Sequence, residues 1–130
     1  MAKILIVDDE CEIRKMLQRV LGRSGHALFE ASNGQEAIEQ LRRESHELVI
    51  TDIVMPEKEG LETIMQIRRD FPDVKIIAIS GGGRVGATHY LDMAQRVGAD
   101  RTFAKPFDRT DVINAVRELL GQDIIPVQHF

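Results

Sequence analysis

The chain has 130 residues, a formal net charge of −4 and one cysteine, with 43% hydrophobic and 29% charged residues. This length suits a single domain whose core needs neither a disulfide nor a structural metal. The acidic balance argues against a nucleic-acid-binding protein, and the pairs Arg42–Arg43 and Arg68–Arg69 are interpreted as solvated helix faces. No apolar run approaches the ~18 residues of a membrane span and no signal segment follows Lys3, which predicts a cytoplasmic protein without membrane contact.

Short apolar runs alternate along the chain with segments of helical periodicity. The runs at residues 3–7, 27–31, 48–51, 74–80 and 102–104 predict strands, and the first suits a strand buried on both faces. Between them, apolar residues recur every three or four positions, which predicts helices that begin near residues 13, 35, 61, 89 and 109. Asp108 is expected to cap the last helix, and Asp9 is a candidate cap of the first.

Five strands alternating with five helices predict an α/β fold, a three-layer sandwich with a parallel sheet between two layers of helices. We expect one domain at residues 1–121 and a C-terminal tail at residues 122–130. The tail is rich in apolar residues, and we expect it to fold back on the domain or to meet a partner.

Polar residues stand where several of the predicted strands end. They are Asp8, Asp9, Asp52, Ser80 and Lys105. Ligand sites in parallel α/β sheets lie beyond the carboxyl ends of the strands, so these side chains are expected to share one crevice.

Three neighbouring carboxylates repel one another unless one is protonated or a cation lies between them. An all-oxygen site without His or Cys favours Mg²⁺ (or Mn²⁺), which often shares its coordination with a phosphate. A carboxylate can then act as a nucleophile and become an aspartyl phosphate, while the metal and a lysine neutralise the phosphoryl oxygens. The sequence therefore suggests phosphoryl chemistry.

Four segments with their order and spacing resemble the response-regulator receiver domain of two-component signalling. These are LIVDDE at 5–10, VITDIVMPEKEGLE at 49–62, AISG at 78–81 and AKPF at 104–107. The resemblance spans residues 3–120 and implies a flavodoxin-like sheet with strand order 2-1-3-4-5, one of the common orders of doubly wound α/β folds.

The resemblance also implies a role for each strand-end residue. The implied site comprises the phosphoacceptor Asp52, the metal ligands Asp8, Asp9, Asp52 and the carbonyl of Val54, the switch hydroxyl of Ser80, and Lys105. It further implies a cis peptide between Lys105 and Pro106 and a loop turned by Gly60.

Two features depart from the family pattern. Thr102 occupies the position where receivers commonly carry an aromatic switch residue, while Phe103 is expected to face the core. The glycine-rich loop at residues 81–86 is about three residues longer than usual, which predicts a mobile fourth helix.

The function implied is a signalling switch that catalyses only its own phosphorylation and dephosphorylation. A histidine kinase or histidine phosphotransfer protein would phosphorylate Asp52, and the face of the fourth helix, fifth strand and fifth helix would bind a downstream protein. The resemblance also allows a homodimer. Two alternatives remain open: an interaction module that is never phosphorylated, and a Mg²⁺-dependent phosphatase with an aspartate nucleophile.

Overall fold

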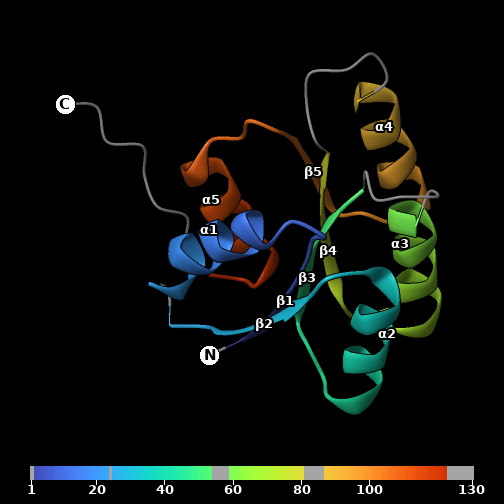
Figure 1. Cartoon of the computed structure of the whole chain (residues 1–130), viewed down its shortest axis with the longest axis horizontal. Coiled ribbons are helices and arrows are strands. Elements are labelled where there is room, and N and C mark those ends of the chain that lie inside the picture. Colours follow the sequence, from blue (N-terminus) through green and yellow to red (C-terminus); the bar gives the residue numbers. More distant parts are fainter. Residues whose placement is uncertain (1, 24, 54–58, 81–86, 123–130) are drawn as a thin grey trace.

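The structure, a computed structural model, describes residues 2–23, 25–53, 59–80 and 87–122 (Figure 1). The strands are β1 (Lys3–Val7), β2 (Ala27–Ala31), β3 (Leu48–Asp52), β4 (Lys75–Ser80) and β5 (Arg101–Ala104). They form one parallel sheet in the order β2-β1-β3-β4-β5. The α/β class and the 2-1-3-4-5 order are confirmed, and each strand end differs from its expected position by at most one residue.

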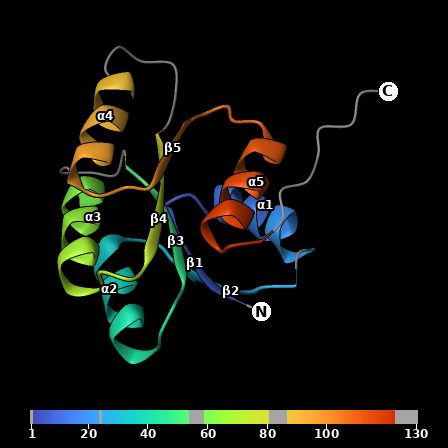
Figure 2. The same ribbon diagram turned by 180° about the vertical axis from the view of Figure 1, so that it is seen from behind.

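Within the described ranges, five helices connect or follow the strands. They are α1 (Cys11–Gly22), α2 (Gly34–Arg43), α3 (Glu59–Asp70), α4 (Ala87–Val97) and α5 (Arg109–Leu119). Helices α1 and α5 lie on one face of the sheet and α2, α3 and α4 on the other, as the two opposite views show (Figures 1 and 2). The predicted three-layer sandwich is confirmed. None of the described helices is long and apolar enough to cross a membrane.

The central strands are apolar at nearly every position because helices cover both of their faces. In β1, Ile4 and Ile6 pack with residues of α1 and α5, whereas Leu5 and Val7 pack with residues of α2, α3 and α4. These four side chains are at most 1% exposed. Burying one such side chain contributes about 1.5–3 kcal/mol to folding. The packing holds β1 firmly, and with it the polar residues that follow.

Helix α1 begins earlier than its apolar stripe predicts, at Cys11. Its N-cap is Glu10, whose side chain makes no capping hydrogen bond, so the interpretation of Asp9 as a helix cap is wrong. The polar residues ahead of the stripe complete an extra half turn of helix. At the start of α5, by contrast, the Asp108 side chain accepts a hydrogen bond from the Thr110 amide, as predicted.

Gly60 lies in the first turn of α3 and not in a loop, so that prediction is wrong. A Cβ atom at Gly60 would lie 2.3 Å from the carbonyl oxygen of Ile53, much closer than non-bonded atoms approach. Glycine is needed here because α3 begins against the backbone that leaves β3. The residue thus allows a close approach of helix and strand beside the end of β3.

Candidate functional site

The strand-end residues lie at one edge of the sheet. Asp8 follows β1 directly, Asp52 and Ser80 are the last residues of β3 and β4, and Lys105 follows β5. These four strands are consecutive neighbours and run parallel, so their carboxyl ends meet at the same edge. This is the edge at which open α/β sheets bind ligands.

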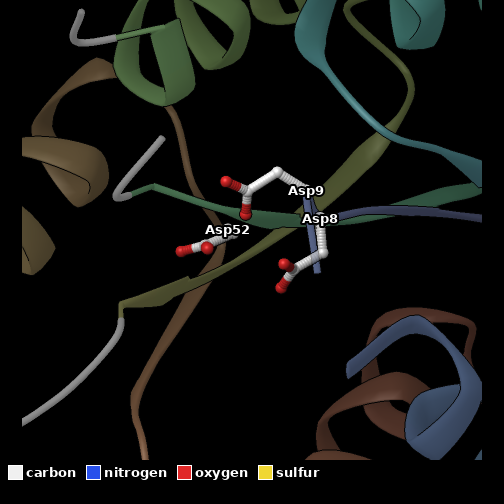
Figure 3. A group of neighbouring side chains, drawn as sticks. All are labelled: Asp8, Asp9 and Asp52. Carbon is white, nitrogen blue, oxygen red and sulfur yellow. The ribbon is translucent and has the colours of Figure 1, made fainter. Parts of the chain in front are cut away.

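Three carboxylates form an acid cluster at this edge, made of Asp8, Asp9 and Asp52. One oxygen from each lies within 4.8 Å of the others. Asp8 and Asp52 are 2% and 4% exposed, whereas Asp9 is open to solvent. Figure 3 shows Asp8 and Asp9 at successive positions after β1 and Asp52 on the neighbouring strand, with their side chains turned toward a common space.

The Lys105 ammonium lies beside two members of the acid cluster. Its Nζ is 3.4 Å from Asp8 Oδ2 and 3.7 Å from Asp52 Oδ2. The peptide bond between Lys105 and Pro106 is cis, as the resemblance implies. The Lys105 amide also donates to the carbonyl oxygen of Ser80 at 2.8 Å, which ties the residue to the end of β4. One ammonium beside three carboxylates leaves an excess of negative charge.

Asp8 is held at several atoms. Its amide donates to the carbonyl oxygen of Ala31 at 3.1 Å, and its Oδ1 accepts from the Glu10 amide at 2.8 Å. Burial raises the pKa of the Asp8 carboxyl, and the Glu10 amide and Lys105 offset this only in part, while Asp9 adds to it. Among the described residues, the ionised form of Asp8 therefore lacks full compensation.

These atoms fit a small divalent cation. Mg²⁺ binds oxygen ligands at about 2.0–2.1 Å and keeps several waters, so opposite ligands lie about 4.2 Å apart. One oxygen from each member of the acid cluster lies within 4.8 Å of the others, which is close to this separation. A cation would also remove the repulsion among the carboxylates. Val54, whose carbonyl is the remaining implied ligand, lies outside the described residues.

Ser80 is buried next to the acid cluster. Its Oγ has no hydrogen-bond partner among the described residues, and its neighbour Ile79 is paired with Asp52 across the sheet. Leaving a buried hydroxyl without a partner costs about 1–3 kcal/mol, so such a group calls for an explanation. The glycine-rich loop expected at residues 81–86 lies outside the described residues.

The position of the missing aromatic residue has an ordinary environment. Thr102 is half-buried on β5, and the neighbouring Phe103 packs against the core beneath α1 and α5, as predicted. The alternation along β5 places these two side chains on opposite faces of the sheet.

One residue that contacts the site is not suggested by the apolar pattern of its helix. Arg14 of α1 donates to the carbonyl oxygen of Asp8 at 2.6 Å. Its position six residues after Asp8, one turn into the helix, is the only sequence signal, and a basic residue there is equally consistent with a solvated helix face. The contact depends on how α1 packs on the sheet.

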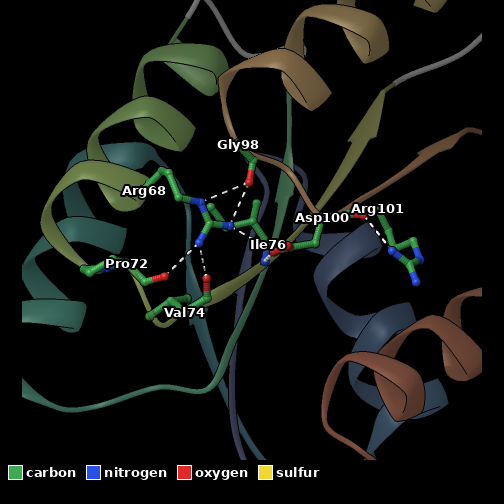
Figure 4. A network of polar contacts seen from close by, with 7 residues as sticks. All are labelled: Arg68, Pro72, Val74, Ile76, Gly98, Asp100 and Arg101. Carbon is green, nitrogen blue, oxygen red and sulfur yellow. Dashed lines mark hydrogen bonds and ion pairs between the residues drawn. The ribbon is translucent and has the colours of Figure 1, made fainter.

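The opposite edge of the sheet carries a second polar cluster, centred on Arg68 of α3 (Figure 4). Its guanidinium donates to the carbonyl oxygens of Pro72, Val74 and Gly98 and to Asp100 Oδ2, at 2.7–3.1 Å. The side chains of Arg68 and Asp100 are each 29% exposed. The interpretation of Arg68 as part of a solvated face is therefore wrong, because its side chain folds inward over the turns that precede β4 and β5.

Known proteins match the chain along most of its length. Residues 4–117 match the response regulator receiver domain. Sporulation initiation phosphotransferase F of Bacillus subtilis (strain 168) is 34% identical over 121 residues, which cover 91% of this chain and 93% of that protein. Chemotaxis protein CheY of Thermotoga maritima is 33% identical over 118 residues, covering 90% of this chain and 96% of that protein.

A solved structure extends the similarity to three dimensions. The crystal structure of response regulator protein TrrA from Thermotoga maritima, in complex with Mg²⁺-BeF, has a TM-score of 0.79 and 35% sequence identity, covering 92% of this chain and 99% of that one. Three observations support the same assignment: the family match over residues 4–117, the order of the strands, and the acidic residues at the strand ends. The chain belongs to the response-regulator receiver domain family.

Proposed function

We propose that this receiver domain is a phosphoacceptor switch in which Asp52 accepts a phosphoryl group in a Mg²⁺-dependent reaction. The observation that carries the proposal is the acid cluster with Lys105 beside it, at the ligand-binding edge of the sheet. Receiver domains bind Mg²⁺ at an acidic pocket and are phosphorylated by histidine kinases or phosphotransfer proteins.

Each residue of the site would have a separate role in phosphoryl transfer. A carboxylate oxygen of Asp52 forms a bond to phosphorus while the P–N bond of a phosphohistidine donor breaks, and the imidazole nitrogen keeps the bonding electrons. Asp8, Asp9, Asp52 and the carbonyl of Val54 would hold Mg²⁺ (or Mn²⁺), which would neutralise charge on the transferred oxygens when bound. Lys105, 3.7 Å from Asp52, would donate to one phosphoryl oxygen.

The Ser80 hydroxyl would transmit phosphorylation of Asp52 to the surface that binds a downstream protein. Its Oγ has no partner among the described residues, so it gains a hydrogen bond when it donates to a phosphoryl oxygen on Asp52. The Ser80 carbonyl is bonded to the Lys105 amide, so a shift at the end of β4 reaches β5 directly. The surface formed by α4, β5 and α5 would then present a changed face to a downstream protein.

The proposal is tested by labelling the protein with a small phosphodonor, acetyl phosphate, in the presence of Mg²⁺. The intact mass should increase by one phosphoryl group, and chelation of the metal should prevent the increase. Asp52→Asn should remain unlabelled because its amide is not a nucleophile. The control Asp73→Asn, at an exposed position in the turn before β4, should label normally. Labelling of Asp52→Asn at the normal rate would refute the assignment.

A further inference from the structure

Arg14 links three elements beside the acid cluster. From α1, its Nη1 donates to the carbonyl oxygen of Asp8 at 2.6 Å, and its Nε donates to Glu30 Oε1 on β2 at 3.1 Å. The Arg14 side chain is 16% exposed, compared with 38% for Glu30. The guanidinium therefore holds α1 against the end of β1 and uses Glu30 to fix its own orientation.

The contacted carbonyl belongs to the peptide group that joins Asp8 to Asp9. The next peptide group, between Asp9 and Glu10, is held as well, because the Glu10 amide donates to Asp8 Oδ1 at 2.8 Å. Peptide groups are planar, so two anchored planes define the backbone direction from which the Asp9 side chain leaves. Asp9 is the solvent-exposed member of the acid cluster and the one that burial does not hold in place.

We propose that Arg14 is a positioning residue that directs Asp9 toward Asp52 before the metal ion binds. The inference rests on the proposed Mg²⁺-dependent function. Repulsion from Asp8 and Asp52 favours an outward movement of the Asp9 carboxylate in the metal-free protein. The Glu10 side chain makes no capping bond that would fix the turn between β1 and α1. Arg14 opposes the movement by holding the Asp8–Asp9 peptide group, which keeps the ligands assembled for the ion.

Geometry and charge predict opposite effects when Arg14 is replaced. A nearby guanidinium repels a divalent cation, so loss of its charge alone would strengthen Mg²⁺ binding. Loss of its hydrogen bonds would weaken Mg²⁺ binding, because the ligands would no longer be held together. Arg14→Gln removes the charge and both contacts, whereas Arg14→Lys keeps the charge but cannot reproduce the two-armed contact to Asp8 and Glu30.

The test measures the Mg²⁺ dissociation constant of the whole chain by titration, following amide NMR signals of residues 8–10 and 52. We expect the constant to increase about tenfold in both Arg14→Gln and Arg14→Lys, a typical loss when a residue that supports a metal ligand is replaced. Arg19→Gln removes the same charge from an exposed position on the same helix and should leave the constant unchanged. Glu30→Gln, at an exposed position, should give a smaller increase and remain folded even if Arg14 variants do not.

The outcomes separate this inference from the proposed function. Normal Mg²⁺ binding by the unaltered protein, with unchanged or tighter binding by Arg14→Gln, would overturn the role of Arg14 and leave the function intact. Failure of the unaltered protein to bind Mg²⁺ would overturn both. In the metal-free protein, the amide signals of Asp9 and Glu10 should shift in the Arg14 variants and stay in place in Arg19→Gln. If Arg14 variants do not fold, unchanged Mg²⁺ binding by Glu30→Gln would count against the proposal.

Discussion

The two edges of the sheet carry polar clusters of opposite character. At the carboxyl-end edge, three carboxylates lie beside one ammonium, and the Ser80 hydroxyl has no partner among the described residues. At the other edge, the Arg68 guanidinium is surrounded by three carbonyl oxygens and the Asp100 carboxylate. The described residues leave the first cluster with an excess of negative charge, whereas they compensate the charge of the second. Burial of polar groups therefore indicates binding at one edge and stability at the other.

The largest expected effect is at the compensated edge. Arg68→Ala should lower the free energy of unfolding by about 2–3 kcal/mol, somewhat less than the loss for a fully buried ion pair, because Arg68 and Asp100 are each 29% exposed. Asp100 Oδ2 would keep only its bond from the Ile76 amide among its described contacts. Urea unfolding measures the change.

The adjacent arginine provides a matched control for that experiment. Arg69 is paired only with its sequence neighbour Asp70 among the described residues, and its side chain is 72% exposed. Arg69→Ala should change the free energy of unfolding by less than about 0.5 kcal/mol. Equal losses in Arg68→Ala and Arg69→Ala would show that the network around Arg68 contributes nothing beyond surface charge.

The two edges also differ in how far the sequence predicts them. Asp8, Asp52 and Lys105 are predictable because each interrupts or follows an apolar run, and parallel strands bring such positions to one edge. The role of Arg68 is not predictable, because most of its hydrogen-bond acceptors are backbone carbonyls in turns. Every residue has a backbone carbonyl, so the residue type does not reveal such a contact. Arg14 escapes prediction for the same reason, since it contacts the backbone of Asp8.

Gly60 shows the same limit in a different form. The sequence pattern draws attention to this glycine but indicates a loop, whereas the structure shows a helix start pressed against the Ile53 carbonyl. The distance between two elements depends on their packing. Local pattern therefore predicts which elements form and where polar residues interrupt them, but it does not predict which backbone atoms a side chain will meet.

At the acidic edge, a substitution should stabilise the protein. Asp8→Asn replaces a buried carboxyl group, whose pKa is raised by burial, with a neutral amide. The amide oxygen can still accept a hydrogen bond from the Glu10 amide. In metal-free buffer we expect the free energy of unfolding to increase by about 1 kcal/mol, because a carboxylate without full compensation is replaced by a neutral group of the same shape. With Mg²⁺ present, the unaltered protein should gain stability by ligand binding and Asp8→Asn should gain much less.

This substitution also provides a direct comparison of the two edges. Metal-free Asp8→Asn could instead lose as much stability as Arg68→Ala. That result would mean that Lys105 compensates the charge of Asp8 fully, and it would contradict the proposed difference between the two edges. The exposed control Asp73→Asn should change the free energy of unfolding by less than about 0.5 kcal/mol in either buffer.

The pH dependence sharpens the same contrast. Folding raises the pKa of Asp8 above its ordinary value, so between the unfolded and the folded pKa this group binds more protons in the folded chain than in the unfolded chain. By linkage, the contribution of Asp8 to stability is fully present below the unfolded pKa and is lost as pH rises through the folded pKa. The stability advantage of Asp8→Asn over the unaltered protein should therefore be small in acid and grow with pH.

Urea unfolding of the two proteins at several pH values, in metal-free buffer, measures this difference. Comparing the pair cancels the contributions of carboxylates that lie far from the acid cluster. An advantage of Asp8→Asn that stays constant or shrinks as pH rises would show that the Asp8 pKa is not raised by folding.

The smallest expected loss of stability concerns the Ser80 hydroxyl. Ser80→Ala should not lower the free energy of unfolding of the metal-free protein, because its Oγ makes no hydrogen bond to the described residues that could be lost and removing a buried hydroxyl without a partner is neutral or stabilising. Thr51→Val is the matched comparison, since the buried Thr51 Oγ1 donates to the carbonyl oxygen of Asp52 at 3.1 Å. That substitution should cost about 1 kcal/mol. If Ser80→Ala lowers the free energy of unfolding as much as Thr51→Val does, the Ser80 hydroxyl already makes a hydrogen bond in the unphosphorylated protein. It would then not be available to a phosphoryl oxygen without breaking that bond.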